Sequence, residues 1–312
     1  MIVELPNTTT AVVSKQLVKV REEGGAVALG RVLTLIISTT PGEEEEAISA
    51  ANEASREHPM RVIVLSIPDE DTGITNRLDA EIRVGGDAGA SEVIVLRAYG
   101  KAGSDEQGLV TGLLLPDAPV VAWWPGRAPH VASTSPLGQI AQTRITDAFA
   151  HEDSDVALVH LSQTYSPGDA DFAWTRLTLW RTQLAAVLDQ PPYESILSGR
   201  VSAAPGSPSA RLMAAWLQLQ LQIPIEYHEL HSDDKDGSIH EIVLTRSSGD
   251  IRLSRVNPQV AKLEQPGQPK HEVTLVRRSL RDCLAEELRR LDPDDVYGKV
   301  IVEGVPLLGL TP

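Results

Sequence analysis

Apolar and polar positions follow two different patterns in the two halves of the chain. In the first half, residues 31–37 and 61–67 form continuous apolar runs rich in β-branched side chains, which is typical of strands buried on both faces. A helical pattern over 43–57 lies between them, and another over 9–23 precedes them. The order strand, helix, strand predicts a parallel pair joined by a right-handed crossover.

The rest of the first half continues this pattern. Strands are expected at 79–84, 91–98 and 119–125, with a glycine-rich turn at 85–89 and a helix at 105–114. We therefore predict an α/β fold that begins with an N-terminal domain, in which flanking helices cover a mixed, partly parallel sheet. The polar segment 162–171, centred on Pro167 and Gly168, is the best candidate for a linker. It predicts domains at 1–164 and 165–312.

The second half begins with helical patterns. The segment 172–188 places its large apolar side chains on one helical face, and a second helix over 210–222 follows Ser207 and Pro208. The residues of the first face are Trp174, Leu177, Trp180, Leu184, Val187 and Leu188. A last amphipathic helix is expected at 279–291.

Between these helices, residues 225–230, 239–245, 251–256 and 272–276 alternate apolar and polar positions with a period of two. Asp-Gly at 236–237 and Gly-Asp at 249–250 stand where hairpin bends would fall. The pattern predicts an antiparallel sheet with one covered face. The C-terminal domain is therefore expected to be α+β.

Composition narrows the range of partners. The chain has 312 residues, with 28 basic and 43 acidic side chains and a formal net charge of −15, so nucleic acid and anionic membranes are poor partners. The first residues carry no signal-peptide pattern, and no apolar stretch approaches the length of a membrane span, so we expect a cytoplasmic protein. The single cysteine, Cys283, excludes an intrachain disulfide and is expected to be buried and inert.

The sequence lacks the common catalytic motifs. The chain has no Walker A sequence, no G-x-S-x-G elbow and no G-x-G-x-x-G at 85–89. The ligand-rich segment 228–236 fits neither H-E-x-x-H nor an EF-hand, and is interpreted as a solvated hairpin tip. The acidic run 43–46 suits the dipole of a helix N-terminus. We therefore expect no enzyme activity, no cofactor and no metal.

All five tryptophans lie in the middle third of the chain, several of them beside arginines. Such clusters are either core or the anchors of an interface, and the neighbouring arginines either form ordinary salt bridges or bind a partner. The candidate partner-binding residues are Trp123, Trp124, Arg127, Trp174, Arg176, Trp180 and Arg181. Because neighbouring side chains of a strand point to opposite faces, one of Trp123 and Trp124 is expected to face outward. His58 and Arg61, near a strand end, are candidate contacts for a small ligand.

Two segments carry a family resemblance. Leu115-Pro-Asp-Ala-Pro-Val-Val-Ala-Trp-Trp-Pro-Gly126 and Trp174-Thr-Arg-Leu-Thr-Leu-Trp-Arg181 are long and rich in rare residues. They resemble the glucose-6-phosphate dehydrogenase assembly protein family, of the OpcA type in its actinobacterial form, and the likeness extends over most of the chain. The resemblance implies a non-catalytic protein that binds glucose-6-phosphate dehydrogenase in the oxidative pentose phosphate pathway and promotes its active oligomer, by assembly or as an allosteric activator.

An alternative stays open from the residues alone. The α/β first half, with His58, Arg61 and Arg127 near predicted strand ends, would also suit an enzyme or sensor that binds a sugar phosphate or nucleotide of the same pathway. Direct titration with small phosphates separates this hypothesis from protein–protein assembly.

Overall fold

The computed structural model describes residues 1–23, 32–68, 75–85, 92–230 and 238–310. Residues 86–89 of the turn expected at 85–89 and residues 231–236 of the hairpin tip expected at 228–236 lie outside these ranges. The chain forms two compact units, which are treated separately below. The first contains Met1–Thr146, Gly168–Ala170 and Leu280–Pro293, and the second contains Asp147–Pro167, Asp171–Ser279 and Asp294–Pro312. Neither unit is continuous in sequence, and the domain boundary at 164/165 stays a prediction.

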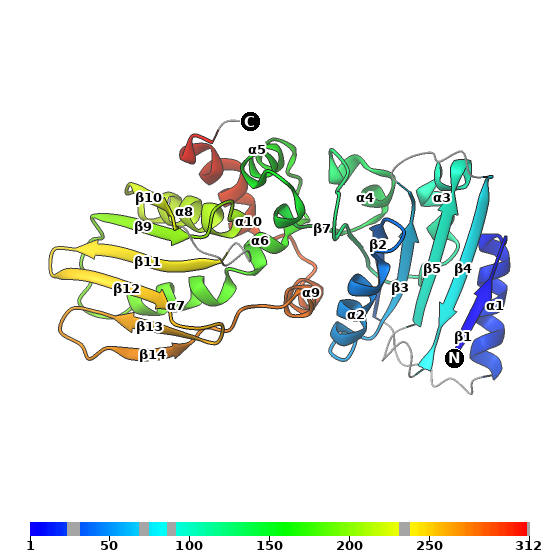
Figure 1. Ribbon diagram of the computed structural model, residues 1–312, viewed down its shortest axis with the longest axis horizontal. Coiled ribbons are helices and arrows are strands. Elements are labelled where there is room, and N and C mark those ends of the chain that lie inside the picture. Colours follow the sequence, from blue (N-terminus) through cyan, green and yellow to red (C-terminus); the bar gives the residue numbers. More distant parts are fainter. Residues whose placement is uncertain (24–31, 69–74, 86–91, 231–237, 311–312) are drawn as a thin grey trace. The chain divides into compact units, whose positions relative to one another are not determined.

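The first unit is built on an eight-stranded sheet in the order β1-β4-β5-β3-β2-β6-β7-β8 (Figure 1). The strands are β1 (Ile2–Leu5), β2 (Leu33–Thr39), β3 (Met60–Ser66), β4 (Arg77–Arg83), β5 (Glu92–Tyr99), β6 (Val120–Trp123), β7 (Thr143–Thr146) and β8 (Asp169–Asp171). β2 pairs in parallel with β3 and β6, whereas β4 pairs antiparallel with β1 and β5. The predicted β-α-β unit and the mixed, partly parallel sheet are confirmed.

Helices cover both faces of this sheet. They are α1 (Thr10–Glu23), α2 (Glu44–Ala54), α3 (Glu106–Thr111), α4 (Pro136–Ile140) and α9 (Leu280–Arg289), with short 3₁₀ turns at Gly100–Gly103 and Ala132–Thr134. Side chains of α1, α3 and α4 share one apolar cluster with Ile36, Ile63 and Ile94 of the central strands. On the opposite face α2 contacts β3, and α9 contacts α2. Cys283 of α9 is fully buried, as predicted.

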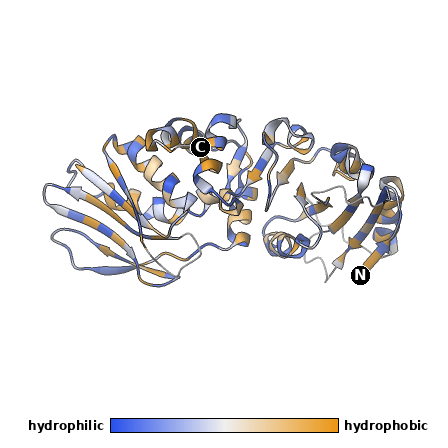
Figure 2. Ribbon diagram, turned by 45° about the horizontal axis from the view of Figure 1, so that its top comes forward, coloured by the Kyte–Doolittle hydropathy of each residue, from blue (hydrophilic) through white to orange (hydrophobic). Residues whose placement is uncertain are grey.

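The second unit contains a six-stranded sheet in the order β10-β9-β11-β12-β13-β14. The strands are β9 (Ser198–Ala203), β10 (Ile225–Glu229), β11 (Ile239–Arg246), β12 (Gly249–Arg255), β13 (Val260–Glu264) and β14 (His271–Thr274). Across the sheet from β9 to β14, neighbours pair antiparallel, and hydrophobic and hydrophilic positions alternate along the strands (Figure 2). The α+β prediction is confirmed, but the expected hairpin between β10 and β11 is wrong. β9 lies between these two strands and pairs in parallel with β10.

The helices of this unit are α5 (Ser154–Thr164), α6 (Phe172–Thr175), α7 (Thr178–Leu188), α8 (Pro208–Leu221) and α10 (Asp295–Lys299). Short turns of 3₁₀ or π-helix lie at Ala148–Ala150, Val300–Gly304 and Val305–Leu308. Because α5 ends at Thr164 and β8 begins at Asp169, the connection between them is shorter than the expected linker. The single helix predicted over 172–188 is divided between α6 and α7.

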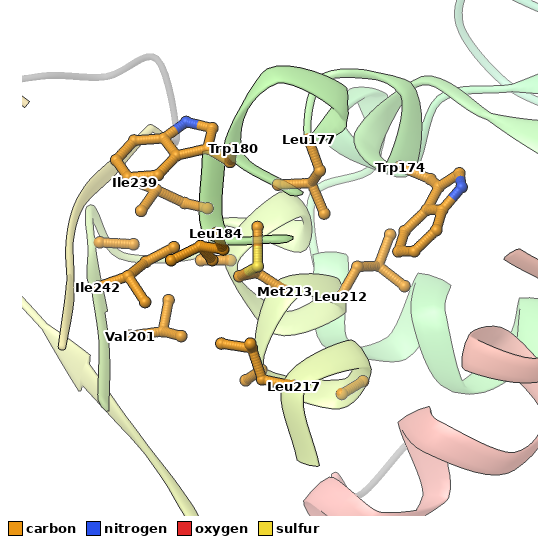
Figure 3. Packing of buried hydrophobic residues seen from close by; sticks show 14 of the residues in the cluster. Trp174, Leu177, Trp180, Leu184, Val201, Leu212, Met213, Leu217, Ile239 and Ile242 are labelled. Carbon is orange, nitrogen blue, oxygen red and sulfur yellow. The ribbon is translucent and has the colours of Figure 1, made fainter. Parts of the chain in front are cut away.

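The predicted apolar face of that segment does form the core. Trp174, Leu177 and Trp180 lie in one cluster with α8 and the inner face of the sheet. Figure 3 shows Trp180 beside Ile239, with Trp174 beside Leu212. No helix in the described ranges has both the length and the apolar character needed to cross a bilayer.

Candidate functional site

The tryptophan pair at the end of β6 is part of the core of the first unit. Trp123 is 0% exposed and Trp124 is 4% exposed. Trp124 packs in the apolar cluster beneath α1, α3 and α4. The expectation that one of the two faces outward is therefore wrong, because helices cover both faces of the sheet. Arg127, three residues beyond Trp124, is exposed.

The two candidate small-ligand contacts are placed at the start of β3. Arg61 is buried, and its guanidinium donates to Glu92 Oε2 at 2.8 Å and to the carbonyl of Leu113. Arg21 donates to both oxygens of the same carboxylate. This network occupies the Arg61 guanidinium with structural contacts. His58 precedes the strand, and its buried Nε2 has no hydrogen-bond partner among the described residues.

The acidic residues at the start of α2 include one, Glu44, that does more than interact favourably with the helix dipole. Glu44 is buried, and it accepts hydrogen bonds from Ser66 Oγ at 2.9 Å and from the backbone N–H of Gly42 at 2.7 Å. Burial raises the pKa of this carboxyl, but these hydrogen bonds and the charge of Arg97 outweigh burial and lower the pKa below its usual value. Glu44 is therefore a structural carboxylate that fixes α2 to β3.

In the second unit, Trp174 holds two polar groups in place. The Arg181 guanidinium lies 3.7 Å from the centroid of the indole, a cation–π stack. The indole Nε1 donates to Asp294 Oδ2 at 2.9 Å. Trp174 itself is only 3% exposed. The indole is therefore a buried support for Arg181, a residue of intermediate exposure.

Two other sequence-predicted residues, Arg176 and Trp180, line a cavity of about 380 Å³ in the second unit. We call this cavity the arginine pocket. Its walls come from the segment before α5, from α6 to α8, and from the strands β11 and β12 with the segment after β14. The lining residues are Phe149, Arg176, Leu177, Trp180, Ser209, Ser238, Ile239, Arg255, Val276, Arg277, Arg278 and Ser279.

Arg176 is paired with a carboxylate behind it. Arg176 Nη1 and Nη2 donate to the two oxygens of Asp147 at 2.8 and 2.6 Å. Asp147 also accepts from the N–H of Phe149, whose ring lies 5.7 Å from the Arg176 guanidinium. This bidentate pair fixes Arg176 and offsets its charge.

The other three arginines also make hydrogen bonds within this unit. Arg255 Nη1 donates to the Leu275 carbonyl at 2.7 Å, and its guanidinium lies 5.2 Å from the centroid of the Trp180 ring. Arg277 Nη2 donates to Ser238 Oγ at 2.9 Å. Arg278 Nη1 donates to the carbonyl of Thr175 at 3.2 Å. These contacts hold the guanidiniums in defined orientations.

Arginine side chains dominate the polar part of the pocket lining. Guanidiniums bind phosphate and carboxylate oxygens through paired N–H donors, and hydroxyls and aromatic rings complete such sites. The described lining holds no His, Asp, Glu, Cys or Lys. No group of three or more His, Cys, Asp or Glu side chains in the described part of the chain is arranged to hold a metal ion.

Sequence reasoning missed Arg255, Arg277 and Arg278. The adjacent pair at 277–278 is a visible signal, but Arg289 and Arg290 form an identical pair. Only the packing of β12 and the segment after β14 against α7 brings these side chains to Trp180. A second hollow of the unit, about 440 Å³ beside the end of α8, is lined by Gln218, Leu219, Gln222, Ile223, Pro224 and Leu307. The described lining of that hollow contains no charged group.

Two family models match the chain in succession. Residues 51–163 match the model described as the N-terminal domain of the glucose-6-phosphate dehydrogenase subunit. Residues 167–301 match the model described as the C-terminal domain of the same glucose-6-phosphate dehydrogenase subunit. No curated protein matches the sequence.

Among solved structures, an oxidoreductase from Sinorhizobium meliloti aligns with a TM-score of 0.48 and 8% identity, covering 89% of this chain and 96% of that one. An oxidoreductase from Pseudomonas syringae aligns with a TM-score of 0.46 and 9% identity, covering 90% of this chain and 96% of that one. Likeness at this level carries no conclusion about activity.

Proposed function

This chain belongs to the glucose-6-phosphate dehydrogenase assembly protein family, and we propose that it binds that dehydrogenase and promotes the formation of its active oligomer. The observation that carries the proposal is the match of both domain models, in chain order, over residues 51–163 and 167–301. The protein acts as a non-catalytic partner in the oxidative pentose phosphate pathway and works in the cytoplasm. It activates the dehydrogenase either by assembling it or by shifting it allosterically.

The arginines, rather than the tryptophans, supply the contacts with the partner in this proposal. Trp123, Trp124, Trp174 and Trp180 are each at most 4% exposed, so they support the surface from below. Arg127 is exposed, and Arg181 is partly exposed above Trp174. Arginine is enriched among the residues that dominate binding energy at interfaces, which supports Arg127 and Arg181 as the contact residues.

The charge of the chain supports a basic surface on the partner. The formal net charge is −15, and opposite charge on the dehydrogenase would accelerate encounter at low ionic strength. We therefore expect the association rate to fall as salt is added, because ions screen the long-range attraction.

The experiment is dehydrogenase turnover with and without this chain, together with light scattering of the mixture after size exclusion. Co-elution of the two proteins with raised turnover and a larger dehydrogenase oligomer is the expected result. A mixture that elutes as two separate proteins with unchanged turnover would overturn the proposal. A complex with raised turnover and an unchanged dehydrogenase oligomer would assign the effect to an allosteric shift.

A further inference from the structure

We propose that the segment 189–197, which joins α7 to β9 and which we call the tyrosine loop, docks on the dehydrogenase through Tyr193 and Leu197. The inference rests on the proposed function and deepens it, because it names a contact surface in the second unit for the same partner. The surface that the loop fits is an apolar depression flanked by basic side chains.

The tyrosine loop presents apolar side chains to solvent. Tyr193 is 78% exposed and Leu197 is 57% exposed, which are the two highest exposed fractions among the large apolar side chains of the described residues. Pro191 and Pro192 are exposed in the same segment. Single exposed apolar residues are ordinary on a protein surface, but their concentration in one short segment is typical of an interaction site.

Two charged side chains fix the loop to the hairpin of β11 and β12. Arg246, which is 5% exposed, donates from Nη1 to the Pro192 carbonyl at 3.1 Å. Glu194 Oε2 accepts from Ser247 Oγ at 2.8 Å and from the N–H of Ser248 at 3.1 Å. These hydrogen bonds and the charge of Arg246 lower the pKa of Glu194, so the carboxylate stays ionised. A buried guanidinium and an ionised carboxylate thus hold the loop in place.

The backbone of the loop is held as well. The N–H of Leu197 donates to the Thr245 carbonyl at 2.8 Å, and the N–H of Glu194 donates to the Pro192 carbonyl at 2.9 Å. None of the hydrogen bonds that fix the loop uses the Tyr193 side chain. A loop that is ordered before binding loses little conformational entropy when it docks, and tyrosine is enriched among the residues that dominate binding energy at interfaces. The loop is therefore suited to insert its aromatic ring into a partner.

Charge indicates the kind of partner. The charged residues of the loop, Asp189 and Glu194, are both carboxylates, and Asp189 is exposed, as is Asp250 of the neighbouring strand β12. Lysine or arginine side chains around an apolar depression would complement this surface. A second copy of this chain would bring the same carboxylates face to face in a two-fold contact, and like charges repel. The observations therefore favour a different protein, with a basic surface, over a second copy.

The test measures the concentration of the full chain that gives half-maximal activation of the dehydrogenase. The loop variant, Tyr193→Ala with Leu197→Ser, is expected to raise this concentration by about tenfold or more, because it removes the side chains that enter the partner. Both side chains are exposed, so the circular dichroism spectrum and the thermal unfolding of the variant are expected to match those of the parent chain. Leu307→Ser is the matched control, since Leu307 is 51% exposed in the same unit, and it is expected to leave the half-maximal concentration unchanged.

A charge reversal tests the basic flank of the partner. Asp189→Lys is expected to raise the half-maximal concentration more than Glu152→Lys does, although both variants change the net charge equally and both residues are exposed in the second unit. Equal effects of the two variants would mean that no basic side chain of the partner lies beside the loop, and would overturn that part of the proposal.

The remaining outcomes separate this inference from the proposed function. If the parent chain neither co-elutes with the dehydrogenase nor activates it, the proposed function fails and the inference fails with it. If the parent chain activates the dehydrogenase and the loop variant weakens activation no more than Leu307→Ser does, the inference alone is overturned. It is also overturned if light scattering of this chain alone shows a dimer that the loop variant dissociates, because the loop would then join two copies.

Discussion

The indole of Trp174 carries the Arg181 guanidinium 3.7 Å from its ring centroid, and its Nε1 donates to Asp294 Oδ2 at 2.9 Å. Asp294 in turn accepts from the backbone N–H groups of Val296 and Tyr297, so it caps α10. One buried side chain thereby joins α6, α7 and the N-terminus of α10. The same indole therefore supports Arg181 and is anchored through its Nε1.

Asp294→Ala is expected to lower the free energy of unfolding of the second unit by about 1–2 kcal/mol, because it removes both the helix cap and the acceptor of the indole N–H. Urea titration followed by circular dichroism measures the change. Asp295→Ala removes an acidic residue from the first turn of the same helix without removing the cap, and is expected to cost less. If the two variants lowered the free energy of unfolding equally, the Asp294 cap would not stabilise the unit.

Trp124→Ala is expected to destabilise the first unit by about 3–5 kcal/mol, because the indole is 4% exposed in a packed cluster and its removal leaves a cavity. Thermal unfolding measures this loss. Trp124→Phe, which keeps an aromatic ring, is expected to cost less. An alanine variant as stable as the parent protein would mean that Trp124 is not a core residue, and would make it available as a direct partner contact.

The parts of the fold that the sequence predicts are those specified by local pattern. The apolar side chains around Ile36 are buried as expected, and so are Trp174, Leu177 and Trp180. The spacing of apolar residues along the chain follows from which side chains the element buries, so it can be detected in the sequence. β9 is not predicted, since its sequence Ser-Gly-Arg-Val-Ser-Ala has weak strand character. Its insertion beside β10 depends on long-range pairing.

The candidate site is predicted in part for the same reason. Arg176 and Trp180 stand four residues apart beside other aromatics, so a local pattern identifies them as candidates. Arg277 and Arg278 lie about a hundred residues further along the chain and reach the same cavity only through tertiary packing. No periodicity connects them to α7. For the tryptophans, the sequence does not distinguish core from interface, since both environments select large rigid side chains.

Glu92→Gln is expected to destabilise the first unit by about 3–5 kcal/mol, because Glu92 is fully buried and its loss of charge leaves the buried Arg61 uncompensated. Chemical denaturation measures the effect. Glu45→Gln is the matched control, since its side chain is 67% exposed in its pair with Arg83, and a change below about 1 kcal/mol is expected. If both variants lose less than about 1 kcal/mol of unfolding free energy, the buried Arg61 does not depend on Glu92. The hypothesis that Arg61 contacts a small ligand then regains support.

The lowered pKa of Glu44 predicts a pH dependence of stability. Because the folded state depresses this pKa below its usual value, the folded state favours the ionised form. The resulting stabilisation is present above the unfolded pKa and is lost as pH falls through the lower, folded pKa. Glu44→Gln is expected to reduce stability at pH 7 and to flatten the dependence at acidic pH, as measured by urea titration at several pH values. If Glu44→Gln lowered the free energy of unfolding by the same amount at every pH, the loss would come from packing and not from the charge of Glu44.

The last prediction concerns the surface that meets the dehydrogenase. Arg127→Ala is expected to raise the concentration of this chain needed for half-maximal activation of the dehydrogenase by roughly tenfold, since arginines at interface hot spots contribute about 1–2 kcal/mol or more. Arg127 is exposed, so the variant is expected to fold normally.

Arg56→Ala is the control for this experiment, because Arg56 is also exposed in the first unit and the substitution changes the net charge by the same amount. If both variants weaken activation equally, overall charge determines the affinity and no specific contact of Arg127 is needed. If neither variant does, while the parent chain still activates the dehydrogenase, the contact surface lies elsewhere, and Arg181 above Trp174 becomes the next residue to replace. In that case Arg181→Gln is the informative change, since it removes the charge that Trp174 supports and leaves the indole and its bond to Asp294 in place.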